Sequence, residues 1–154
     1  MNPSANNQWS RLNPLQVGKY AEYLTKMEFT KNGLEVFSPE IDDHGIDLII
    51  LKTESEKFYE VQVKSVRDKT NYIYLTKEKL KNSHNILVAV VLFNENQSPK
   101  MFLIPIAEWD KPNSLLVDHE YENKKSKPEY GINISKKNME LLNKYPFDKT
   151  LNNL

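Results

Sequence analysis

Residues 58–66, with the sequence FYEVQVKSV, decide the fold because two kinds of side chain alternate along them. Successive side chains of a β-strand point to opposite faces, so this alternation predicts a strand with one apolar and one polar face. Glu60, Gln62 and Lys64 share the polar face and are spaced about 6–7 Å apart. The opposite face carries the side chains that can join a core, namely Tyr59, Val61, Val63 and Ser65. The strand therefore presents an acid, an amide and an ammonium group in one row.

Asp47 lies in the preceding apolar segment, residues 46–52, with the sequence IDLIILK. A carboxylate among such neighbours is costly to bury unless it is paired with a cation or bound to a metal ion. The charged residues 53–56 predict a turn, so the two strands are expected to form an antiparallel hairpin. In that hairpin Asp47 lies across from Gln62 and Lys64.

An amphipathic helix is predicted over residues 14–32. Asn13 is typical of an N-cap, Pro14 of the first helical position, and Gly33 of a helix end in the left-handed conformation. Apolar side chains follow helical spacing at Val17, Tyr20, Ala21, Leu24 and Met27. Glu22 lies at the border of this apolar face and could reach the carboxylate of the hairpin.

Shorter elements complete the predicted fold. Residues 86–93 are continuously apolar, which favours a strand buried on both faces. Further strands are expected at residues 34–38, 71–75, 101–106 and 130–134. Helical segments are expected from Thr76, at 107–110, and at 135–145 with Ser135 as cap, while 111–130 is expected to be irregular. This order predicts an α/β fold, a mixed β-sheet flanked by helices.

Length and composition indicate a single domain over residues 14–145, with a flexible N-terminal lead-in at 1–13 and a frayed tail at 146–154. The chain has no cysteine, which excludes a disulfide scaffold and a thiolate zinc site. The start of the sequence shows no signal-peptide pattern, and residues 86–93 fall far short of the ~20 needed to span a membrane. We therefore expect a soluble, cytoplasmic protein without a membrane partner.

The charge pattern gives no sign of a nucleic-acid partner, since 21 basic residues balance 21 acidic ones. Lysines form local groups within residues 64–69, 77–81 and 124–127, each of which is typical of an ordinary solvated face. The polar row of Glu60, Gln62 and Lys64, with Asp47 across from it, indicates a function more specifically. Oxygen ligands beside a lysine are what metal-assisted phosphodiester hydrolysis needs, since Mg²⁺ prefers carboxylates, carbonyls and water.

These residues resemble a known family. Residues 45–50 (GIDLII) followed by 60–65 (EVQVKS) resemble the D…(D/E)xK signature of the PD-(D/E)xK nuclease superfamily, whose fold is restriction-endonuclease-like. The motif Gly18-x-x-x-Glu22 resembles the first helix of its Holliday-junction-resolvase-like branch. The pattern GxD…QVKS is most similar to that of small bacterial domains of this superfamily, and the resemblance covers residues 14–110.

The resemblance implies a metal-dependent DNA endonuclease that uses Mg²⁺ (or Mn²⁺). In it, Asp47 would be the metal-binding acid, Lys64 the catalytic lysine, and Glu22 the helix acid that joins the metal ligands. Gln62 falls where the family has Asp or Glu. Since a chain of 154 residues has little room for specificity elements, a homodimer or a partner protein is expected to complete the grip on DNA.

The sequence departs from the family pattern at Ile46, where proline is usual, and at Gln62. An amide oxygen can bind Mg²⁺ but brings no negative charge, so metal affinity should fall. Glu60 could compensate in part, and Asp43 or His44 could add a ligand or a base. Gln62 and the zero net charge leave a second interpretation open, a catalytically inactive nuclease-fold module that binds DNA or a protein. A third, an unrelated small-molecule-binding α/β domain, requires the hairpin prediction to fail.

Overall fold

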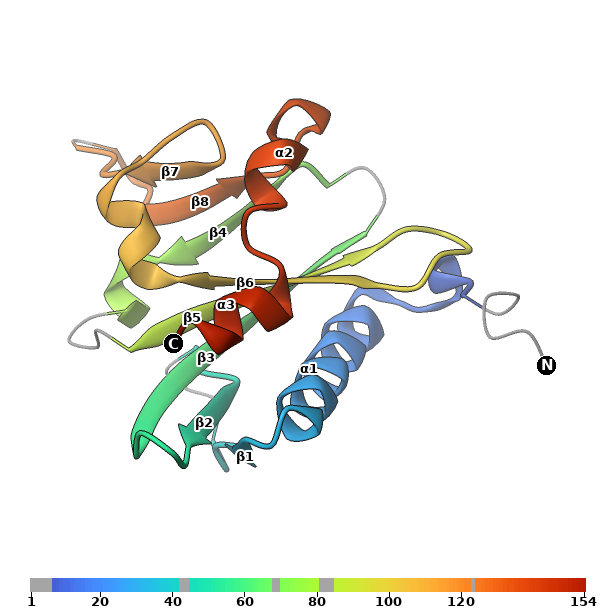
Figure 1. The fold of residues 1–154 in the computed structure, drawn as a ribbon. Helices are drawn as coiled ribbons and strands as arrows, with labels where there is room; N and C mark the ends of the chain where they lie inside the picture. The colour runs from blue at the N-terminus through green and yellow to red at the C-terminus, as the bar shows by residue number, and fades with distance from the viewer. Residues whose placement is uncertain (1–6, 42–44, 68–69, 81–84, 123) are drawn as a thin grey trace.

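The computed structural model describes residues 7–41, 45–67, 70–80, 85–122 and 124–154 (Figure 1). Within these ranges the strands form two sheets. The larger sheet has the order β1 (Glu35–Phe37), β2 (Leu48–Lys52), β3 (Lys57–Arg67), β5 (Ile86–Phe93) and β6 (Lys100–Pro105). The smaller has the order β4 (Tyr72–Thr76), β8 (Glu129–Asn133) and β7 (Leu116–His119). The helices are α1 (Pro14–Lys31), α2 (Met139–Leu142) and α3 (Phe147–Asn152), with short 3₁₀ turns η2 (Trp9–Arg11), η3 (Lys77–Leu80), η4 (Ile106–Asp110) and η5 (Lys136–Asn138).

The larger sheet is mixed, as predicted. β2 and β3 form the expected antiparallel hairpin, with Leu48 opposite Val61 and Lys52 opposite Lys57. β3 runs parallel to β5, while β5 pairs antiparallel with β6. Every residue of β5 is buried, because one face is covered by helices and the other by the smaller sheet. The prediction of an α/β fold with a mixed sheet is confirmed.

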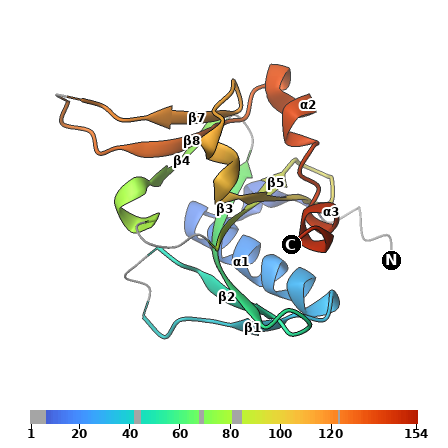
Figure 2. The ribbon, with the colours of Figure 1, turned by 60° about the vertical axis from the view of Figure 1, so that its left-hand side comes forward.

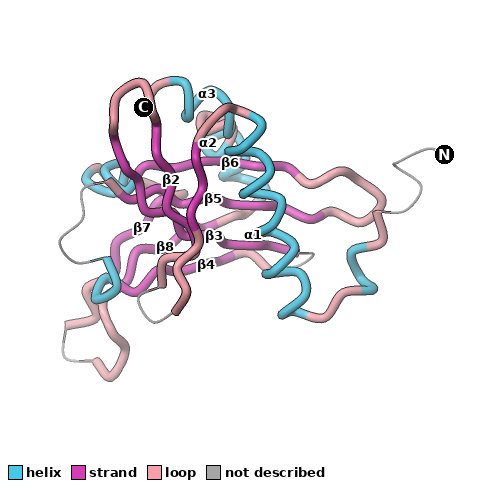
Figure 3. Tube along the Cα trace, turned by 90° about the horizontal axis from the view of Figure 1, so that it is seen from below, coloured by secondary structure: helices cyan, strands magenta, loops and turns pink. Residues whose placement is uncertain are grey.

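Helix α1 begins and ends as the sequence predicts. The side chain of Asn13 accepts a hydrogen bond from the Gln16 backbone at 2.9 Å, and the Gln16 side chain accepts one from the Asn13 backbone at 2.8 Å. Gly33 ends the helix with a φ of +82°. The apolar face packs on the sheet through buried Val17, Ala21 and Phe29, so α1 lies across β3 (Figure 3).

The smaller sheet covers the opposite face of the larger one, with α2 beside it (Figure 2). It was not predicted as a separate sheet. β7 lies in the segment 111–130 that was expected to be irregular, and this expectation is wrong. The strand has four residues, of which only Leu116 is fully buried, so its alternation is too short to recognise. Its partner β8 fixes it in place.

The predicted helix over residues 135–145 is interrupted. The side chain of buried Asn138 donates hydrogen bonds to the carbonyls of Ser114 and Asn133, at 2.9 and 2.8 Å. These bonds tie the chain to the smaller sheet, so a 3₁₀ turn precedes α2. Ser135 makes no side-chain capping bond, contrary to the prediction.

Two terminal segments are more ordered than expected. Trp9, in the predicted flexible lead-in, is only 6 % exposed and its indole donates to the Gln97 carbonyl at 2.9 Å. Arg67 binds this segment through the carbonyls of Trp9 and Leu12. The predicted frayed tail instead contains α3, a short helix stabilised by packing on the core rather than by its own sequence.

Replacing Phe147 with alanine tests the packing of α3. Phe147 is buried, and its ring centroid lies 4.8 Å from that of Phe29. We expect Phe147→Ala to lower the free energy of unfolding by about 3–5 kcal/mol, as large-to-small core substitutions do. Urea unfolding measures the change, with Asn153→Ala at an exposed position of the same segment as control. An unchanged urea midpoint for Phe147→Ala would show that the segment does not belong to the core.

Candidate active site

Asp47 stands where β2 and β3 separate. Its backbone N–H donates to the Val61 carbonyl at 2.9 Å, and its Oδ2 accepts a hydrogen bond from the Val63 backbone N–H at 2.6 Å. Regular pairing of the two strands ends at Leu48 and Val61, so the Val63 N–H has no ladder partner on this side. The Asp47 carboxylate takes that partner's place.

Gln62 is 5 % exposed, yet its amide makes no hydrogen bond to any part of the chain that the structure describes. Among those same residues, no fully buried side-chain polar atom lacks a partner. The polar atoms of Gln62 therefore keep some contact with solvent. A buried amide that the protein does not satisfy is a ready ligand for water or an ion.

Gly45 lies beside this amide. Its φ of +71° is in the region that favours glycine, and a Cβ at this position would lie 3.5 Å from Gln62 Nε2. The same Cβ would lie 2.9 Å from Cδ of Lys79, which is closer than carbon atoms pack. Glycine at this position thus lets the chain pass between Gln62 and Lys79.

Lys64 is half-buried on β3, opposite Val90 of β5. Burial lowers the pKa of its ammonium group and the positive charge of Lys79 lowers it further, while the carboxylate of Asp47 opposes both effects. Across the described ranges, neither a hydrogen bond nor an ion pair engages the Lys64 side chain. Its ammonium group therefore remains available to a ligand next to Asp47.

Glu22 is paired with a neighbouring lysine of α1. Its carboxylate forms an ion pair with Lys19 at 2.7 Å on the surface of α1. The pKa of Lys19 is raised, first by the hydrogen bond to Glu22 and then by the charge of that carboxylate. Among the residues described, no group of three or more His, Cys, Asp or Glu side chains could hold a metal ion. The structure therefore brings Asp47, Gln62 and Lys64 together without gathering Glu22 into an acidic cluster.

The remaining predicted residues add little to the site. Glu60 continues the row on β3, but it lines an apolar hollow with Phe37, Ile49, Phe58 and Asn85. Asp43 and His44 lie outside the described residues. Lys79 is the residue that the sequence analysis missed, since it was grouped with ordinary surface lysines. No sequence signal connects it with Lys64, because its position depends on the pairing of β4 with β8.

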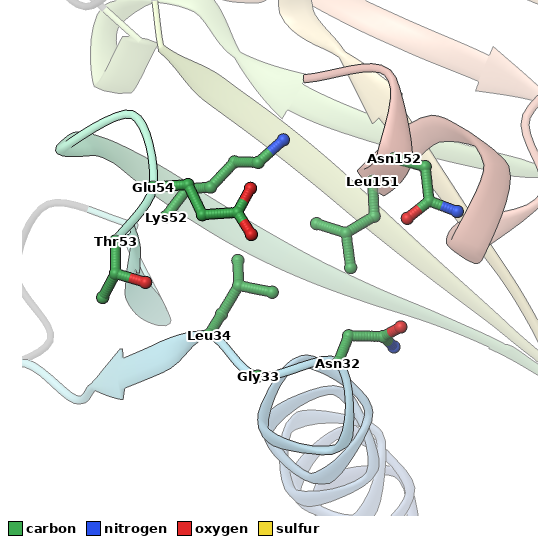
Figure 4. A pocket seen from close by; sticks show the side chains of 8 residues that line it. All are labelled: Asn32, Gly33, Leu34, Lys52, Thr53, Glu54, Leu151 and Asn152. Atoms are coloured by element: carbon green, nitrogen blue, oxygen red, sulfur yellow. The ribbon is translucent and has the colours of Figure 1, made fainter.

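A second hollow lies away from the site, between the end of α1, the β2–β3 turn and α3 (Figure 4). Its one cation, Lys52, extends toward α3 and donates to the Leu154 main-chain oxygen at 2.8 Å. This bond ties the C-terminal segment to the hairpin. The hollow is therefore part of the packing of α3, and Asp47, Gln62 and Lys64 do not line it.

No protein-family model matches the chain, and no curated protein matches it. Several solved structures are similar to it, among them the following two. A Holliday junction resolvase from the archaeal hyperthermophile Archaeoglobus fulgidus is 12 % identical, with a TM-score of 0.46 over 75 % of this chain and 83 % of that one. A bacterial homing endonuclease is 18 % identical, with a TM-score of 0.46 over 75 % of this chain and 85 % of that one.

None of the helices within the described ranges combines the length and the apolar character needed to cross a bilayer.

Proposed function

We propose that the chain is a metal-dependent DNA endonuclease whose site consists of Asp47, Gln62 and Lys64. One observation carries the proposal. The nearly buried Gln62 amide has no partner within the described chain, and it neighbours both the carboxylate and the lysine that the motif supplies. A polar group without a protein partner, beside a carboxylate and a lysine, is a candidate ligand site.

The donor set suits Mg²⁺ or Mn²⁺. The Asp47 carboxylate and the Gln62 amide offer oxygen ligands, which these hard cations prefer, with water completing the shell. When bound, such an ion would neutralise charge on the phosphate and lower the pKa of water. Glu22 is proposed to assist, which requires its carboxylate to exchange the ion pair with Lys19 for the site.

Lys64 is proposed to act on the reacting phosphate. Its ammonium group lies near Asp47, and burial lowers its pKa, so it can stabilise negative charge developing on phosphate oxygens or, when neutral, accept a proton from the attacking water. A new P–O bond forms with that water as the P–O bond to the sugar breaks. The departing sugar oxygen takes a proton from solvent.

Changing Gln62 to glutamate tests the metal role directly. Gln62→Glu restores the carboxylate that the superfamily pattern carries, so we expect about tenfold tighter Mn²⁺ binding and cleavage at correspondingly lower Mn²⁺. Calorimetric titration and ion-dependent plasmid cleavage measure the two effects. Gln62→Met, similar in length but without an oxygen ligand, is the matched control and should lose both. Equal Mn²⁺ affinity in all three proteins would exclude Gln62 as a ligand.

A second candidate function is a nuclease-fold module that binds DNA or a protein without cleaving. Two observations favour it. The described residues contain no cluster of three acidic or histidine ligands, and Asp47 has a structural task in binding the Val63 N–H. Stable DNA binding without cleavage in Mg²⁺ or Mn²⁺ would establish this function instead.

A second copy of the chain, or a partner protein, is proposed to complete DNA binding in the cytoplasm. The reason is size, because a chain of 154 residues has little room for elements that grip DNA beyond the site itself. Light scattering with and without duplex DNA measures the assembly.

A further inference from the structure

The turn η3 places a second lysine over the site. The backbone N–H of Lys77 donates to the Pro128 carbonyl at 3.0 Å, and its ammonium group binds Asp118 and Glu120. Leu80, at the end of the turn, is buried in the core. Both ends of η3 are therefore fixed to the smaller sheet and the core, and this holds Lys79 between them in a defined place.

Lys79, unlike Lys77, is not paired with an acidic side chain of the described residues. Within the part of the chain that the structure describes, no hydrogen bond or ion pair holds its ammonium group. Its alkyl chain instead lies against Gly45, where a Cβ would come within 2.9 Å of Cδ and 3.6 Å of Cβ of Lys79. Gly45 therefore makes room for this side chain immediately next to Gln62.

Lys79 and the Gln62 amide lie on either side of Gly45, since a Cβ there would be 2.9 Å from Lys79 Cδ and 3.5 Å from Gln62 Nε2. Lys64 is two residues after Gln62 on β3, so its side chain lies on the same face of the strand. An anion bound at this place would be attracted by both ammonium groups. The Gln62 amide, which makes no hydrogen bond within the described residues, can donate one to an anionic oxygen. Three donors from two segments of the chain, β3 and η3, thus lie on the same side of the sheet beside Gly45.

We propose that Lys79, Lys64 and Gln62 form a binding site for one backbone phosphate of DNA, with Lys79 serving to hold the phosphate in place. Cleavage of this phosphate rests on the proposed function. Binding of the phosphate is independent of that function, because it requires only the two ammonium groups and the amide. Lys79 is accordingly a binding residue whose effect precedes any chemistry.

The test is the salt dependence of DNA binding. Fluorescence anisotropy with a labelled 20-base-pair duplex, in Ca²⁺ to separate binding from cleavage, compares wild type with Lys79→Gln, Lys79→Arg and Lys125→Gln. A lost phosphate contact should weaken binding by about fivefold to tenfold and reduce the slope of log K against log salt by about 1. Lys79→Arg should restore both values. Lys125 is exposed in the segment after β7, so Lys125→Gln should have a smaller effect on both the affinity and the salt slope.

A second variant moves Lys79 without removing its charge. Gly45→Ala places a Cβ against the Lys79 side chain, so we expect a similar loss of DNA affinity, with circular dichroism confirming the fold. Inorganic phosphate should compete with the duplex in wild type more strongly than in Lys79→Gln. A salt slope for Lys79→Gln equal to that of wild type, or no binding of duplex or phosphate by wild type, would overturn the proposal. Lys79-dependent binding without cleavage in Mg²⁺ would retain this site and refute the nuclease.

Discussion

Asp47→Asn is expected to abolish cleavage while keeping most of the stability of the protein. The asparagine oxygen can still accept the hydrogen bond from the Val63 N–H, so the junction of β2 and β3 is preserved. The negative charge that binds the metal ion is lost, and we expect the cleavage rate to fall at least a hundredfold. Plasmid cleavage and calorimetric Mn²⁺ titration measure the two losses.

Asp47→Ala separates the structural task of this residue from the chemical one. Alanine leaves the Val63 N–H without an acceptor, which we expect to lower the free energy of unfolding by about 1–3 kcal/mol. Both variants should be equally inactive, and only Asp47→Ala should unfold at a lower urea concentration than wild type. Full activity in Asp47→Asn would show that the carboxylate is purely structural.

Lys64→Met is the second large effect. We expect at least a hundredfold loss of cleavage, because a positive group near the reacting phosphate is removed. Mn²⁺ binding should persist, since Lys64 is not a ligand. At neutral pH the free energy of unfolding should rise by about 0.5–1 kcal/mol, because methionine removes a half-buried charge that is costly to keep out of water.

The pH dependence of stability provides a further readout of Lys64. Its pKa in the folded protein is below the ordinary value of 10.5, so the folded state binds fewer protons than the unfolded state. The contribution of Lys64 to stability therefore improves as the pH rises through its folded pKa toward 10.5, and Lys64→Met should lack this increment. Lys57→Met, at the exposed start of β3, is the control. A large loss of stability in Lys64→Met would mean that the attraction between the ammonium group and Asp47 stabilises the fold by more than burial of the charge costs.

The hairpin could be predicted because its information is local. Alternation in residues 58–66 and one carboxylate in an apolar strand place Asp47, Gln62 and Lys64 together without reference to the rest of the chain. The hydrogen bonding of Asp47 could not be predicted, because it depends on where β2 and β3 separate. The bond from the Val63 N–H to Asp47 exists because regular pairing stops there, and no residue pattern marks that point.

What the sequence could not predict depends on distant partners. Lys79 reaches the site because β4 pairs with β8, more than 50 residues later in the chain. Helix α3 is stable because Phe147 meets Phe29 at the far end of α1. Likewise Glu22 has a suitable place on its helix, but the ion pair with Lys19 was not foreseen. Short elements and flexible side chains take their positions from tertiary contacts that propensity does not encode.

Cleavage of a mixed set of plasmid, linear, single-stranded and branched DNA, in Mg²⁺ or Mn²⁺ and in EDTA, tests whether Asp47 and Lys64 form a nuclease site. Wild type, Asp47→Ala and Lys64→Ala are compared at equal concentrations of folded protein. The proposed site predicts ion-dependent cutting of at least one substrate by wild type and by neither variant. Absence of cutting by wild type with every substrate and both ions, or cutting that survives either substitution, would contradict it.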